Sequence, residues 1–183
     1  MQVFSATIDG PWLNVPPIRV GRVPAGSRTP DRYLAASVAG GQRVRVDLYQ
    51  GVEACPFEDD CEWHGWLIVG WGEHLHWVDP VERSARTVRL GSYFGHLYPA
   101  PDALFVASAE RLFRFAPLGT LAWSSSLLGI DGVVLESWSG DVLAGCGEWD
   151  PPGGWRPFRV ARATGELLDA ASGTSTGGDA GES

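Results

Sequence analysis

Residues 67–80, LIVGWGEHLHWVDP, recur as LFVASAERLFRFAP at residues 104–117, aligned without gaps and 37 positions further on. A third, interrupted copy begins as VLAGCGE at residues 142–148. In each copy a short apolar run meets a turn of small residues and Glu, and in the first two an alternating segment follows and ends at Pro. Short apolar runs bounded by turn residues are typical of β-strands, so the repeat predicts small antiparallel sheets.

The pattern extends beyond these copies. A hairpin is expected over 34–48, where Val44, Val46 and Leu48 alternate with polar residues. Repeats of about 37–40 residues, each with a few short strands, are typical of propeller blades. We therefore predict an all-β fold of degenerate propeller-like repeats that form a small or incomplete propeller. A two-sheet β-sandwich is the alternative.

The blade pattern resembles the repeats of WD-repeat and quinoprotein-type propellers. Residues 67–90, 104–123 and 142–167 carry this resemblance. No Trp-Asp pair ends a strand in these copies, because the pair at 149–150 falls in a loop. The resemblance implies a scaffold and does not imply a chemistry.

The chain divides into three expected parts. Residues 1–33 are rich in Pro and are expected to be extended and packed on the domain. Residues 34–168 form the all-β repeat domain, and the Gly/Ser/Thr-rich residues 169–183 are expected to form a disordered tail. The first residues show no basic start before an apolar run, and no run reaches the roughly 18 residues of a membrane span. With three Cys, an odd number, these features predict a cytoplasmic protein with reduced thiols and no membrane contact.

The charge is negative and unevenly placed. The net charge is −8, and residues 53–82 hold eight carboxylates without any Lys or Arg. Acidic surfaces repel nucleic acid and attract basic proteins. The sequence therefore predicts a protein partner of basic character and no nucleic acid, and it leaves the oligomeric state open.

Two segments are the candidate recognition surfaces. The first is the acidic loop expected over 53–62, in which the carboxylates could dock a basic partner, hold a cation, or lie solvated in a turn. The second is the loop GEWDPPGGWRPF at 147–158, whose large aromatics beside charges have the composition of a contact surface. The candidate binding residues are Glu58, Asp59, Asp60, Glu62, Trp149, Asp150, Trp155 and Arg156.

The leading hypothesis is a non-catalytic protein-interaction module without a cofactor, one version of which is an immunity- or antitoxin-like protein that blocks a basic toxin. A second hypothesis is a metal-dependent hydrolase in which His64, His74 and His76 hold Zn²⁺, or nearby carboxylates hold Ca²⁺. A third is a carbohydrate-binding module that uses Trp149 and Trp155. The chain has no nucleophile elbow, phosphate loop or dinucleotide fingerprint, which weighs against an enzyme.

Overall fold

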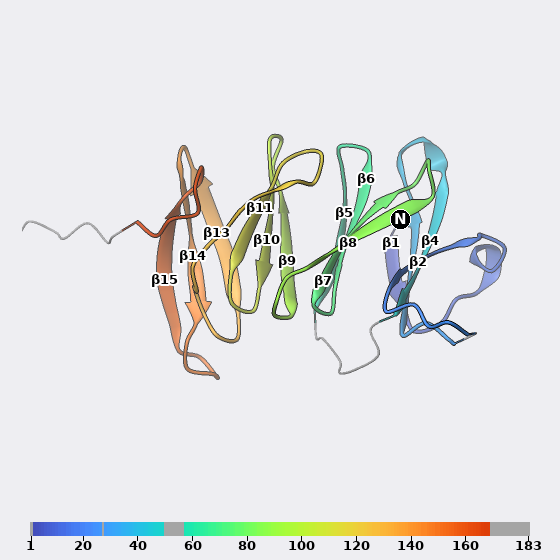
Figure 1. Ribbon diagram of the computed structural model, residues 1–183, viewed down its shortest axis with the longest axis horizontal. Helices are drawn as coiled ribbons and strands as arrows, with labels where there is room; N and C mark the ends of the chain where they lie inside the picture. The colour runs from blue at the N-terminus through green and yellow to red at the C-terminus, as the bar shows by residue number, and fades with distance from the viewer. Residues whose placement is uncertain (1, 27, 50–56, 169–183) are drawn as a thin grey trace, which may run out of the picture.

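The computed structural model describes residues 2–26, 28–49 and 57–168. It is all-β, with four small sheets that follow one another along the chain and along the long axis of the molecule (Figure 1). We name them sheets A to D in chain order. The expected tail, 169–183, lies outside the described residues.

Sheet A holds four strands and both short 3₁₀ helices of the described residues. Its strand order is β1-β3-β4-β2, and β2 lies parallel to β4 while the other pairs are antiparallel. The bounds are β1 Gln2–Ser5, η1 Gly10–Trp12, β2 Pro17–Gly21, β3 Arg32–Ser37, η2 Ala39–Gly41 and β4 Arg43–Tyr49. The Pro-rich segment 1–33 therefore supplies two edge strands, β1 and β2, and Pro17 is tolerated there as the first residue of an edge strand.

Sheets B, C and D run in simple chain order and are antiparallel throughout. Sheet B contains β5 Glu58–Trp63, β6 Trp66–Trp71, β7 His74–Asp79 and β8 Ser84–Arg89. Sheet C contains β9 Phe94–Pro99, β10 Leu104–Ser108, β11 Leu112–Phe115 and β12 Leu121–Ser124. Sheet D contains β13 Val133–Ser139, β14 Val142–Glu148 and β15 Trp155–Ala161. The repeated sequences thus fall on β6–β7, β10–β11 and β14, as their alignment predicts.

Three hydrophobic cores join the four sheets face to face. One lies between A and B around Val46 and Leu67, one between B and C around Trp77 and Phe94, and one between C and D around Phe105. Sheets B and C are covered on both faces, so their central strands are continuous apolar runs instead of alternating ones.

None of the four sheets is closed, and the row is consistent with a small or incomplete propeller-like fold. The first strands β5, β9 and β13 lie side by side along one edge of the row. A two-sheet sandwich is wrong for this chain because its apolar faces are shared among four sheets and three cores.

Gly70 and Gly145 occupy one position of the repeat, where the second copy has Ala107, and both are closely packed. A Cβ atom at Gly70 would lie closer than 3.0 Å to three ring atoms of Phe94, a fully buried side chain from the next sheet. At Gly145 the close neighbours belong to the same sheet: a Cβ there would lie 2.1 Å from the Val134 carbonyl oxygen and 2.7 Å from the ring of its cross-strand partner Phe158. At Gly70, glycine therefore lets an aromatic ring of the next sheet rest directly on the backbone of a strand.

Within the described ranges, no helix has both the length and the apolar character needed to cross a membrane.

Candidate functional site

The segments that precede the first strands of sheets B, C and D lie close together and line a small pocket between these sheets. Its cavity volume is about 90 Å³. The side chains that give it chemical character are Phe57, Tyr93, His96, Asp131, Glu148 and Trp155. Phe57 directly precedes β5, Tyr93 directly precedes β9, and Asp131 lies in the loop before β13. His96 belongs to β9, and Glu148 and Trp155 lie at the facing ends of β14 and β15.

Three aromatic rings form one wall of this pocket. The ring of Phe57 is stacked on Tyr93, with centroids 5.9 Å apart and an interplanar angle of 17°. The edge of His96 meets Phe57 at 5.5 Å, and His96 in turn contacts Tyr98 at 6.2 Å. Each ring is thereby held by a neighbour, so the wall is preformed.

Two carboxylates stand at the pocket, and each is oriented through one of its oxygens. The hydroxyl of Tyr93 donates to Asp131 Oδ1 at 3.0 Å and also contacts the Asp131 carbonyl. The backbone N–H of Gly153 donates to Glu148 Oε1 at 2.6 Å. Within the described residues the second oxygen of each carboxylate, Asp131 Oδ2 and Glu148 Oε2, accepts no hydrogen bond and forms no ion pair. Two oriented acceptors are therefore available to a ligand.

Trp155 covers the other side of the pocket and is 44% exposed. Gly132 faces its indole: a Cβ at Gly132 would lie 3.0 Å from the ring. Trp155, one of the candidate binding residues, thus lines the same pocket as Asp131 and Glu148. The other three residues chosen from the 147–158 loop are absent from the pocket lining.

Trp149 is half-buried and is engaged within the loop. The guanidinium of Arg156 lies 5.7 Å from the centroid of its ring, a cation–π contact that occupies one face of the indole. Asp150 is exposed in the adjoining turn. These three residues shape the loop that carries Trp155.

The acidic segment does not form a loop over its described part. Residues 58–62 are strand β5, the first strand of sheet B, and only 57 precedes it among described residues, since 50–56 lie outside them. Successive side chains of a strand point to opposite faces. The carboxylates of β5 therefore divide between the neighbouring sheets A and C, and the expectation of a solvated loop is wrong for them.

Three of these carboxylates join sheets. Glu58 pairs with Arg32 of β3 at 3.0 Å, and Glu62 accepts the backbone N–H of Ala39 at 2.8 Å, so both bind sheet A. On the opposite face, Asp59 accepts the backbone N–H of Leu97 in sheet C at 3.1 Å. Each caps or pairs a group of a neighbouring sheet, which is a structural role.

Asp60 differs from its neighbours. Its Oδ2 atom is buried, and no hydrogen-bond partner for it lies among the described residues. Burial, together with the charges of Asp59 and Glu62, raises the pKa of Asp60 to about 6. The same burial raises the pKa of the Cys61 thiol to about 12, so this cysteine is a poor nucleophile at neutral pH.

The three histidines proposed as metal ligands are not brought together. His64 lies in the turn after β5, where Nε2 is 2.8 Å from the Pro101 carbonyl oxygen. Along β6, His76 pairs with Val69 and His74 with Trp71, so they lie roughly 10 and 17 Å, respectively, from the start of that strand, where the His64 turn is. Their rings stack at 5.8 Å, and His76 Nδ1 is hydrogen-bonded to Thr87 Oγ1 at 2.9 Å. Burial, with a smaller effect of His74, lowers the pKa of His76 to about 3, so its imidazole is neutral.

Elsewhere among the described residues, no group of three or more His, Cys, Asp or Glu side chains is placed to hold a metal ion. The hydrolase hypothesis based on His64, His74 and His76 therefore has no geometric support in this part of the chain.

The sequence matches no protein-family model and none of the curated proteins.

Five pocket residues were missed as site residues: Phe57, Tyr93, His96, Asp131 and Glu148. A signal for three of them was present, because Phe57, Tyr93 and Asp131 each lie just before the first strand of successive repeats. In a row of blades, equivalent loops lie at the same end, so aligning these positions would have grouped them.

Proposed function

We propose that this protein is a non-catalytic interaction module that binds a basic segment of a protein partner, and that the pocket before β5, β9 and β13 receives an Arg or Lys side chain. The observation that carries the proposal is the pairing of a preformed aromatic wall with the two unpaired carboxylate oxygens of Asp131 and Glu148. A cation is stabilised by the face of an aromatic ring and, more strongly, by hydrogen bonds to carboxylates.

The size of the pocket supports a side-chain ligand. A volume of about 90 Å³ equals roughly three water molecules at about 30 Å³ each, which suits a guanidinium or ammonium group. No Arg belongs to its described lining, so none of these residues brings the permanent charge of a guanidinium to the pocket.

The net charge of −8 supports the same class of partner, because it attracts basic proteins over several ångströms before contact. In this proposal the blades are the scaffold, as in the WD-repeat proteins that they resemble, and the module acts in the cytoplasm. An immunity-like role, in which the pocket blocks a basic toxin or nuclease, is one form of the proposal.

The test uses the full chain and fluorescein-labelled peptides of alternating Gly and Arg, with a matched peptide in which neutral citrulline replaces Arg. Fluorescence anisotropy at about 150 mM salt should show binding of the Arg peptide and at least tenfold weaker binding of the citrulline peptide, a difference of about 1.4 kcal/mol or more. Equal binding of the two peptides would overturn the proposal.

Substitutions then locate the binding site. Trp155→Ala and Asp131→Asn should each weaken binding of the Arg peptide about tenfold. Trp138→Ala is the matched control, because Trp138 is also 44% exposed but lies toward the opposite end of β13. If Trp138→Ala weakens binding as much as Trp155→Ala, the pocket is not the site.

A further inference from the structure

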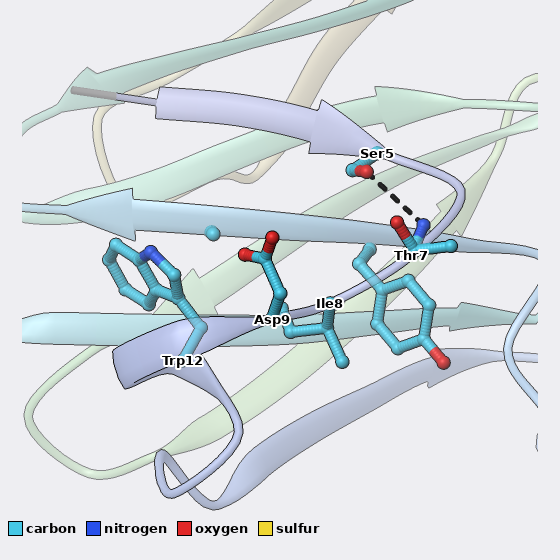
Figure 2. Close-up of a pocket in the computed structure, with 7 residues that line it drawn as sticks. Ser5, Thr7, Ile8, Asp9 and Trp12 are labelled. Carbon is cyan, nitrogen blue, oxygen red and sulfur yellow. Dashed lines mark hydrogen bonds between the residues drawn. The ribbon is translucent and has the colours of Figure 1, made fainter.

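A second, larger pocket lies on the face of sheet A that points away from sheet B. Its cavity volume is about 290 Å³, near the lower end of the range for small-molecule sites. Figure 2 shows the side chains that surround it, from the end of β1, the segment that follows and η1. Those used below are Ser5, Thr7, Asp9, Trp12 and Tyr33.

The carboxylate of Asp9 faces this pocket without a partner. Asp9 is the residue before η1, where an aspartate commonly accepts a backbone N–H, yet its side chain makes no such hydrogen bond. Among the described residues it also forms no ion pair. In Figure 2 its carboxylate points up into the space between Trp12 and the strand that carries Ser5. An acceptor with up to four lone-pair positions is therefore open to a ligand.

The hydroxyl side chains of Ser5 and Thr7 also line this pocket. The backbone N–H of Thr7 donates to Ser5 Oγ at 3.1 Å, which leaves the proton of the Ser5 hydroxyl free to donate elsewhere. The Thr7 hydroxyl belongs to the same wall. The pocket thus combines one charged acceptor with two groups that both donate and accept.

Aromatic rings form two further walls, and both already carry a cation of the chain. The guanidinium of Arg43 lies 5.7 Å from the centroid of Trp12, and that of Arg45 lies 5.4 Å from Tyr33. Arg45 is neutralised by a bidentate pair with the buried Asp47, at 2.7 and 3.0 Å, whereas Arg43 is exposed. The positive charge of Arg43 beside the Trp12 ring disfavours a second cation packed on that ring, so the pocket favours a neutral ligand.

We propose that this pocket binds one sugar ring. A pyranose is neutral, presents apolar C–H faces that pack on aromatic rings, and carries adjacent hydroxyls that donate to a carboxylate. The Asp9 carboxylate receives two of those hydroxyls, Trp12 packs on the ring, and Ser5 and Thr7 bind a third hydroxyl. The pocket before β5, β9 and β13 is too small for such a ring and has no Arg in its described lining, so the two sites select different ligands.

The proposal is independent of the basic-partner proposal, because the two pockets lie on different sheets. The experiment titrates the full chain with the methyl glycosides of glucose, galactose and mannose, followed by the indole N–H signals in NMR spectra. At least one glycoside should shift the Trp12 signal with a dissociation constant on the order of 1 mM, as expected for a single small ring. Tetramethylammonium, a cation of similar width, should not shift it; a response to this cation without a response to any glycoside would overturn the proposal.

Two substitutions decide where the sugar binds. Asp9→Asn should weaken glycoside binding at least tenfold and should leave folding unchanged, because Asp9 is exposed and its side chain bonds to no described residue. Asp150→Asn, another exposed aspartate on a distant loop, is the control and should have no effect. Unchanged binding by Asp9→Asn would place the sugar elsewhere and overturn the proposal.

Comparing the affinities of a trisaccharide and of its methyl glycoside shows whether the bound ring belongs to a glycan or to a single sugar. A trisaccharide that binds at least tenfold more tightly than its methyl glycoside would assign the site to the end of a glycan. Equal affinities would assign it to a single sugar. Both results support the proposal, whereas the absence of binding by every glycoside and trisaccharide would overturn it.

Discussion

Gly70→Ala should destabilise the protein strongly, because the ring of Phe94 from sheet C packs directly against the backbone of Gly70 in sheet B. The added Cβ would lie closer than 3.0 Å to three ring atoms of Phe94, a separation that real Cβ atoms essentially never show. Phe94 is fully buried, so its ring has no open space into which it can move. Overpacking of this kind costs about 1–3 kcal/mol, and we expect the upper end.

The effect is measured by urea unfolding followed by tryptophan fluorescence. With a slope of about 2 kcal/mol per molar urea, a loss of about 3 kcal/mol lowers the midpoint by about 1.5 M. Gly26→Ala is the matched control, because a Cβ at Gly26 meets nothing within 4 Å, and it should change the unfolding free energy by less than about 0.5 kcal/mol.

A double-mutant cycle shows whether the ring is the cause. Phe94→Ala alone should cost about 3–5 kcal/mol by leaving a cavity. In the double variant the methyl group added by Gly70→Ala enters that cavity, so the two costs should fall short of additivity by about 1–3 kcal/mol. The stacking of the two sheets through this contact would be refuted if the losses of unfolding free energy were additive. It would also be refuted if Gly70→Ala were as stable as Gly26→Ala.

Three further predictions concern the polar groups between and within the sheets. Burial and neighbouring carboxylates raise the pKa of Asp60 to about 6, so its contribution to stability is full below about pH 4 and is lost as the pH rises through 6. Because Asp60 is partly exposed, the effect of its charge is reduced, and Asp60→Asn should stabilise the fold by roughly 1–2 kcal/mol at pH 8 and not at pH 4. Urea unfolding at the two pH values measures this, and equal effects at both would contradict it. Thr87→Val should cost about 1–3 kcal/mol in thermal unfolding by leaving His76 Nδ1 buried without its partner, and Thr87→Ser should restore it. Arg32→Ala should cost less than about 1 kcal/mol and should matter less at high salt, because its pair with Glu58 is about one third exposed; a large, salt-independent loss would argue against a surface ion pair.

The strands that the sequence predicts best are those that repeat. The apolar runs at Trp66–Trp71 and Leu104–Ser108 became β6 and β10 because sheets B and C are covered on both faces, and burial of both faces requires continuous apolar residues. The strands of sheet A were harder to predict from the sequence. Its edge strand β2 begins at Pro17 and pairs in parallel with β4, and neither a strand-initial proline nor a parallel partner leaves a local pattern.

Of the candidate site, only the part that has an unusual local composition could be predicted from the sequence. Trp155 was identified because two tryptophans in a Pro- and Gly-rich loop are unusual, and it lies at the pocket. Asp131 was not among the candidate residues. Its partner Tyr93 is far away in the sequence, and their contact arises from the stacking of sheet D on sheet C. Contacts of this kind depend on how the blades are placed and not on local residue patterns.

The acidic stretch shows how composition can mislead about a site. Eight carboxylates without a basic neighbour suggest a recognition surface, yet Glu58, Asp59 and Glu62 each satisfy a group of an adjoining sheet. Their charges still add to the field that attracts a basic partner, since a field depends on total charge and not on hydrogen bonding. A charge that acts through the field changes mainly the association rate and its salt dependence, whereas a carboxylate that touches the ligand changes the dissociation rate. In the proposed interaction, therefore, neutralising Glu58 should slow association, and neutralising Asp131 should speed dissociation.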